Sequence, residues 1–200
     1  MKTLSKELAE AIRPLEMKLK LLWIGVFPVF GIYIFIAWQQ AMRGRENAGS
    51  SPQMLMIAVF LCLTVLVQSL VFRWLTLSPR AITKVLSGNY PVWLKMVANP
   101  DSPKAKAVLK PEYLDALEGD ERKLYEYSSC LFSSIIIQWG MVNTCALFGM
   151  ILPPVQYQPM AAIIAGVLSA GCMLFHFPSI GRTFVAGLEL AEFEKCMHRE

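Results

Sequence analysis

Charge is absent from the hydrophobic parts of this sequence. Four long runs, at roughly residues 21–40, 54–72, 128–152 and 160–180, contain no Asp, Glu, Lys or Arg. Proton relays and ion-coupled carriers usually place ionisable groups inside the bilayer. The absence of such groups therefore argues against a pump or a proton-coupled transporter.

Signatures of catalysis and of metal binding are also missing. The sequence has no Gly-rich phosphate loop, no H-E-x-x-H pair and no nucleophile elbow. Its cysteines have no C-x-x-C spacing and most fall in or beside the hydrophobic runs, so we expect packing residues and no disulfide framework or metal site. They are Cys62, Cys130, Cys145, Cys172 and Cys196. The favoured interpretation has no catalytic residue and no cofactor.

The sequence is rich in hydrophobic residues that form long runs. Of its 200 residues, 55% are hydrophobic, and the excess is concentrated in the four runs. About 20 apolar residues cross a hydrocarbon core about 30 Å thick as an α-helix, whereas the strands of a membrane barrel alternate apolar and polar residues. The runs show no such alternation. We therefore predict an all-α integral membrane protein with four transmembrane helices.

Lys and Arg are distributed unevenly between the runs. Seventeen of the nineteen lie before the first run, between the second and third, or after the fourth, and only Arg43 and Arg45 lie elsewhere. Loops rich in Lys and Arg stay on the cytoplasmic side of a membrane. We therefore predict a bacterial inner-membrane protein whose termini and long middle loop are cytoplasmic. The basic residues are mixed with acidic ones, so nucleic acid is not an expected partner.

The chain divides into five predicted segments. An amphipathic surface helix at 1–20 precedes a first transmembrane hairpin at 21–75. A cytoplasmic loop with short helices at 76–127 leads to a second hairpin at 128–180, which is followed by an amphipathic cytoplasmic helix at 181–200. Corresponding runs of the two hairpins are offset by about 106 residues, which raises the hypothesis of a parallel repeat.

Local signals refine the segments outside the runs. Pro14 predicts a kink or break in the first helix. Ser78 followed by Pro79 predicts a helix start, and Gly88 predicts its end. An apolar stripe within 1–20 predicts a helix that rests on the membrane surface or docks a partner subunit. The stripe consists of Leu4, Leu8, Ile12, Leu15 and Leu19.

Small residues recur at helical spacing in the fourth run. Ala162, Gly166 and Ala170 are four residues apart, and Ser169 lies beside them. Such spacing lets helix backbones approach closely in lipid. Packing within the chain is the main interpretation, and contact with a second copy or another subunit is the alternative.

Few polar side chains lie within the runs. Gln68, Gln138 and Asn143 are expected to form hydrogen bonds between helices, or to line a path for a neutral solute. Tryptophan and arginine at the ends of the runs are typical of anchors at the membrane interface. These anchors are Trp23, Trp38, Arg73 and Trp74.

His176 is the one histidine close to a hydrophobic run. Histidine is a common axial ligand of haem iron, but a second histidine ligand would have to come from a partner, because His198 lies in the tail. The alternative is an interfacial histidine bonded to the backbone or to a lipid headgroup.

The favoured function is therefore non-catalytic. We expect an accessory, structural or assembly subunit of a larger membrane complex, or a self-associating scaffold, whose partners are the bilayer and other membrane subunits. A small channel or carrier for a neutral or weakly polar solute is the first alternative. A haem-binding redox subunit is the second.

Overall fold

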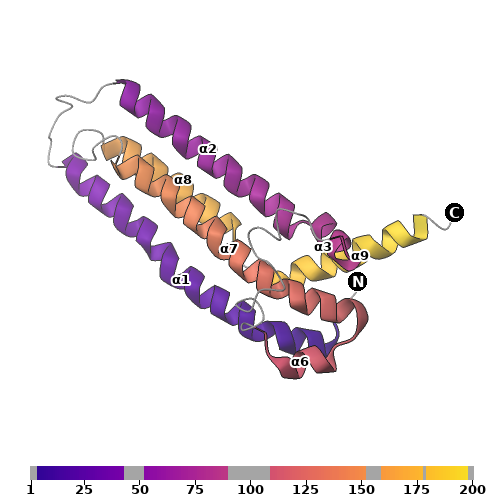
Figure 1. Ribbon diagram of the computed structural model, residues 1–200. Coiled ribbons are helices and arrows are strands. Elements are labelled where there is room, and N and C mark those ends of the chain that lie inside the picture. The colour runs from indigo at the N-terminus through magenta and orange to yellow at the C-terminus, as the bar shows by residue number, and fades with distance from the viewer. Residues whose placement is uncertain (1–3, 43–51, 90–108, 152–158, 178, 198–200) are drawn as a thin grey trace. The chain divides into compact units, whose positions relative to one another are not determined.

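A computed structural model describes residues 4–42, 52–89, 109–151, 159–177 and 179–197 of the chain. The regular structure in these ranges is entirely helical, with seven helices and no strand, so the predicted fold class is confirmed at that level (Figure 1). The helices are α1 (Lys6–Met42), α2 (Pro52–Leu77), α3 (Pro79–Leu86), α6 (Pro111–Ala116), α7 (Gly119–Ile151), α8 (Pro159–Phe175) and α9 (Ile180–Met197).

Three of the helices are long and apolar enough to cross a membrane. These are α1, α2 and α7, and a fourth candidate is the pair α8 and α9 if the two form one broken span. Helix α8 alone has 17 residues, which is at the lower limit for crossing a bilayer. Residues 43–51 of the first predicted hairpin and residues 90–108 of the predicted cytoplasmic loop lie outside the described residues.

The chain packs as two compact units. One comprises Met1–Lys20, Arg73–Ile136 and Pro178–Glu200, and the other comprises Leu21–Phe72 and Ile137–Phe177. Every described Asp, Glu, Lys and Arg belongs to the first, which we call the polar unit, and the described part of the second, the apolar unit, carries none. Backbone packing and side-chain charge thus divide the chain at the same places.

Helix α3 of the polar unit begins and ends as its sequence predicts. Ser78 is the N-cap, and its hydroxyl accepts a hydrogen bond from the Ala81 amide at 3.2 Å, with Pro79 in the first turn. Gly88 follows the helix with φ of 80°, in the left-handed region that a side chain disfavours.

Helices α3 and α9 pack tightly against each other (Figure 1). The buried face of α3 includes Ile82 and Val85, and that of α9 includes Ile180, Phe184 and Gly187. A Cβ atom on Gly187 would overlap with the side chain of Ile82. The missing side chain is therefore what allows the two helices to approach so closely.

Helix α1 bears on two of the predictions. It continues through Pro14 without the break that was one of the two expectations there, because a proline removes one helical hydrogen bond without necessarily ending the helix. Its predicted surface stripe is buried: Leu8, Ile12, Leu15 and Leu19 are at most 3% exposed. The apolar side chains are covered by protein, so the stripe does not rest on a membrane surface.

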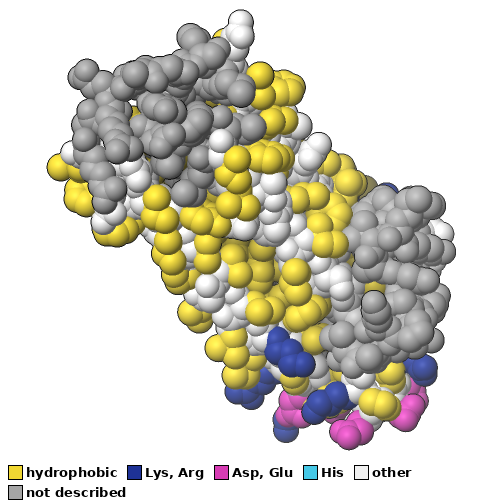
Figure 2. Space-filling view, turned by 60° about the vertical axis from the view of Figure 1, so that its left-hand side comes forward, with side chains coloured by type: hydrophobic (Ala, Val, Ile, Leu, Met, Phe, Trp, Pro, Cys, Tyr) yellow, Lys and Arg dark blue, Asp and Glu magenta, His cyan; other side chains and the backbone are white. Residues whose placement is uncertain are grey.

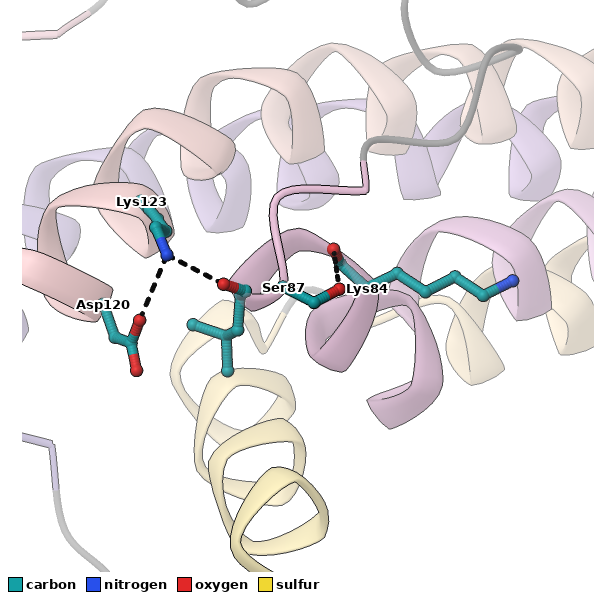
Figure 3. Close-up of polar contacts among 5 residues, drawn as sticks. Lys84, Ser87, Asp120 and Lys123 are labelled. Atoms are coloured by element: carbon teal, nitrogen blue, oxygen red, sulfur yellow. Dashed lines mark hydrogen bonds and ion pairs between the residues drawn. The ribbon is translucent and has the colours of Figure 1, made fainter. Parts of the chain in front are cut away.

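Lys123 of α7 caps the end of α3, as Figure 3 shows. Its ammonium donates to the Leu86 carbonyl at 2.8 Å and lies 3.4 Å from a carboxylate oxygen of Asp120. The last carbonyls of a helix have no partner within the helix and carry partial negative charge. The lysine therefore satisfies a carbonyl that α3 leaves free.

Replacing Lys123 with methionine is expected to lower the free energy of unfolding by about 1 kcal/mol, because the Leu86 carbonyl loses a charged donor while the stem is kept. Chemical denaturation in detergent measures this. Arg122→Met is the matched control: Arg122 forms an exposed ion pair with Glu126, and such pairs contribute about 0.5 kcal/mol or less. Equal effects of the two substitutions would show that the contact with α3 contributes nothing.

Small residues bring the helices of the apolar unit together. A Cβ atom on Gly149 of α7 would overlap with that of Ala165 on α8, and one on Gly166 of α8 would come within 2.8 Å of Ile34 Cγ1 on α1. In lipid, close approach of this kind supplies the dispersion contacts that hold helices together.

The five cysteines form no disulfide bond, and some of them serve as packing residues. Cys62 of α2 and Cys145 of α7 pack with Ala165, and the Cys62 thiol donates to the Cys145 carbonyl at 3.2 Å. This contact links α2 to α7 within the apolar unit.

Hydrophobic side chains cover much of the protein surface. Figure 2 shows many hydrophobic side chains exposed on the visible face. On α1 and α2 the exposed side chains include Ile24, Phe35, Phe60 and Val67. An exposed apolar surface of this extent is unusual for a soluble monomer and is typical of contact with lipid or another protein.

Candidate functional site

The main polar cluster of the apolar unit lies at the end of helix α8. His176 follows the helix directly and is only 1% exposed. One ring nitrogen, Nδ1, lies 2.6 Å from the Cys172 carbonyl oxygen, and the other, Nε2, lies 3.1 Å from the hydroxyl of Ser69 on α2. Residues 107 positions apart in sequence are thus joined inside the protein.

These contacts indicate the tautomer of a neutral His176 ring. A carbonyl oxygen can only accept, so Nδ1 carries the hydrogen and donates to Cys172. In the neutral ring Nε2 then holds the lone pair, and it accepts the hydroxyl hydrogen of Ser69. The thiol of Cys172 also lies near Nδ1, at 3.5 Å.

Two tryptophans donate to the same helix end. The indole Nε1 of Trp23 on α1 donates to the Met173 carbonyl at 3.1 Å, and that of Trp139 on α7 donates to the His176 carbonyl at 3.4 Å. The backbone amide of His176 bonds to the Cys172 carbonyl at 3.0 Å. Side chains from α1, α2 and α7 therefore converge on the last turn of α8.

Capping a helix end is what this arrangement does chemically. The carbonyls at a helix C-terminus lack partners within the helix, and an apolar environment supplies no water to replace them. Trp23 and Trp139 each donate one N–H group to a carbonyl at this helix end, and the Nδ1–H group of His176 is a second donor to the Cys172 carbonyl beside the backbone amide. The cluster thereby adds three side-chain donors to the backbone hydrogen bonds at the end of α8.

The cluster does not fit the predicted haem ligand. An axial ligand needs a ring nitrogen with an open lone pair, whereas Nδ1 of His176 bonds the backbone and Nε2 bonds Ser69. His198 lies outside the described residues. Within the part of the chain that the structure describes, no three His, Cys, Asp or Glu residues come together as a metal site.

The predicted polar residues do not form one group. Gln138 is fully buried, Asn143 is half-buried and Gln68 is exposed, so the three do not share one environment. In α2 the polar side chain that turns inward is Ser69. Neighbours in a helix point about 100° apart, and the sequence alone does not say which of the two faces the interior.

Several buried oxygens lack a hydrogen-bond partner among the described residues. In the apolar unit they include Asn143 Oδ1 and Ser169 Oγ. Ser169 precedes His176 by seven residues, which is about two turns of helix. His176 directly follows α8, so the side chains of Ser169 and His176 lie on the same side of this helix. Polar atoms of this kind favour a shared hydrogen bond or a bound water.

The small-residue face of α8 is turned into the apolar unit. Ala162, Gly166 and Ser169 are buried and Ala170 is half-buried. Because Gly166 lies against Ile34, the face is used for packing within the chain. Contact with a second copy through the same residues would require this packing to open.

The four predicted anchors have different surroundings. Trp38 and Trp74 are 51% and 61% exposed, as an interface anchor requires, and Arg73 is half-buried. Trp23 instead stacks on Phe27 and donates to α8. The sequence analysis did not identify Trp23 or Trp139 as donors to the end of α8. The local sequence signal for the cluster was the four-residue spacing of Cys172 and His176, which places the two residues one helical turn apart.

Comparisons of the chain with protein-family models, with curated proteins and with solved structures found no match.

Proposed function

We propose that the chain is an integral membrane protein with four transmembrane helices in two hairpins and with both termini cytoplasmic. Its function would be non-catalytic: an accessory, structural or assembly subunit of a larger membrane complex, or a self-associating scaffold. The observation that carries this proposal is the division of the chain into a polar unit and an apolar unit without described charge. Burying even one charge in a bilayer costs several kcal/mol, about 2.5 or more.

The use of the buried polar groups supports a structural role. His176, Trp23 and Trp139 stabilise the end of a helix, and the proposal requires no reacting group among them. A solute path is less well supported, because Gln68 is exposed while Gln138 is buried. The two residues would have to face a common space to line such a path.

Native mass measurement after mild detergent extraction tests the assembly role. We expect a species heavier than the 22.5 kDa chain, held together by a partner or a second copy. Harsh detergent should release the single chain and serves as the control. A lone monomer under both conditions would contradict the proposal.

Thiol labelling tests the proposed topology. Cys196 on α9 is exposed, whereas Cys62, Cys130 and Cys145 are buried. A membrane-impermeant maleimide is expected to label Cys196 in inside-out vesicles and not in intact cells. Cys196→Ser should abolish the signal. Labelling in intact cells would place the tail outside and reverse the proposed orientation.

A further inference from the structure

The charges of the polar unit are graded along its helices. Within five residues of the apolar unit in sequence, four side chains are cationic and one is acidic. The cations are Lys18, Lys20, Arg73 and Arg182, which we call the cationic collar, and the acid is Glu16. Farther away, the described part of the polar unit has eight cations and eleven carboxylates. The positive charge is therefore concentrated in the residues that border the apolar unit in sequence.

Glu16 does not cancel the charge of the collar. One carboxylate oxygen accepts a 2.7 Å hydrogen bond from the Gly181 amide, at the start of α9, and the other lies 3.8 Å from the Lys20 ammonium. A carboxylate at a helix N-terminus balances the partial positive charge of that end. The same contacts place Lys20 of α1 beside the first turn of α9, which carries Arg182. Lys18, Lys20 and Arg182 are exposed.

Exposed apolar side chains accompany the collar. Met17 and Leu21, which flank the two lysines in α1, are 55% and 65% exposed, and Trp74 follows Arg73. Aliphatic and indole groups beside cations are typical of the headgroup layer, where the apolar part enters the lipid and the cation meets phosphate. A site for a soluble anion has no need of exposed apolar neighbours.

We propose that the cationic collar binds the phosphodiester headgroups of anionic phospholipids. This inference rests on the proposed insertion of the chain in a membrane. Lys18, Lys20 and Arg182 contact the lipid phosphates, and Met17 and Leu21 contact the upper part of the acyl chains. Each cation near an anionic surface strengthens binding about fivefold, and salt weakens it through screening.

The test compares lipid binding to the full-length chain in neutral detergent, by native mass spectrometry, with phosphatidylglycerol and phosphatidylcholine as probes. Removing three collar charges is expected to lower phosphatidylglycerol binding by roughly 100-fold, at about fivefold per cation, and to leave phosphatidylcholine binding unchanged. A control variant removes three cations that are more than about ten residues from the apolar unit in sequence, and it should bind as the wild type does. The collar variant is Lys18→Gln, Lys20→Gln, Arg182→Gln, and the control is Lys110→Gln, Arg122→Gln, Lys195→Gln.

A charge-preserving variant, Lys18→Arg with Lys20→Arg, should bind phosphatidylglycerol like the wild type. Its failure to bind would overturn the proposal, as would wild-type binding by the collar variant or an equal loss in the control. Competition by soluble glycerol phosphate at the same concentration as the lipid would assign the collar to a soluble anion instead. Incorporation into phosphatidylcholine vesicles separates the two proposals. A chain that incorporates without preferring phosphatidylglycerol overturns only the collar, whereas a chain that never incorporates overturns membrane insertion as well.

Discussion

Replacing Gly187 with alanine is expected to lower the free energy of unfolding by about 3 kcal/mol, the upper end of the usual cost of overpacking. The added Cβ atom would overlap with Cβ, Cγ1 and Cγ2 of Ile82. These atoms belong to a β-branched side chain with restricted χ1, so they have little room to move. Either α3 shifts away from α9 or the rotamer of Ile82 is strained. Chemical denaturation in detergent measures the loss.

A glycine-to-alanine substitution at another helix position provides the control, because it should not lower the free energy of unfolding. Gly140 lies in helix α7, and among the described residues no atom beyond its chain neighbours and its own helix backbone comes within 4 Å of an added Cβ. Gly140→Ala is therefore expected to leave stability unchanged or raise it by up to about 1 kcal/mol, because alanine favours the helix over glycine. Combining Gly187→Ala with Ile82→Ala should cost at least about 1 kcal/mol less than the sum of the two single effects, since truncating Ile82 relieves part of the overlap. Strict additivity would show that the two positions do not meet.

The helices were predictable because their signals are local. Hydrophobic length indicates α1, α2 and α7, and Ser78, Pro79 and Gly88 mark the ends of α3 through backbone chemistry that depends on a few neighbouring residues. Burial of Leu8 and its stripe was not predictable in the same way. A bilayer surface and a neighbouring helix offer the same apolar contact, so an amphipathic pattern does not distinguish between them.

The polar cluster was beyond sequence reasoning for a different reason. Its bonds join positions far apart: Ser69 to His176, Trp139 to His176 and Trp23 to Met173. The sequence identifies His176 as unusual, and its bond to a backbone carbonyl was one of the two interpretations. Which serine, glutamine or tryptophan completes the cluster depends on the rotation of each helix, and the hydrophobic runs leave that rotation undetermined because they are apolar on all sides.

The pairing of Ser69 with His176 predicts that removing both side chains lowers the free energy of unfolding by less than the sum of the two single losses. Ser69→Ala removes the donor to Nε2 and leaves a buried acceptor unpaired, which costs about 1–2 kcal/mol. His176→Phe keeps an aromatic ring but removes the Nδ1–H donor to Cys172 and the acceptor for Ser69. We expect it to cost about 2–3 kcal/mol. Both losses are measured as changes in the free energy of unfolding in detergent.

Removing both partners at once leaves no unpaired group between them. The variant with Ser69→Ala and His176→Phe is therefore expected to be more stable, by about 1 kcal/mol, than the sum of the single losses predicts, a size typical of a hydrogen bond between membrane helices. Thr64→Ala is the matched control in α2, because the hydrogen bond that its hydroxyl makes within the described residues is an exposed one, to the Phe60 carbonyl one turn earlier. It should change stability by less than about 0.5 kcal/mol and add to His176→Phe without coupling. If Ser69→Ala were equally uncoupled, the two side chains would not act as a pair, and the capping of α8 would depend on the tryptophans and the backbone alone.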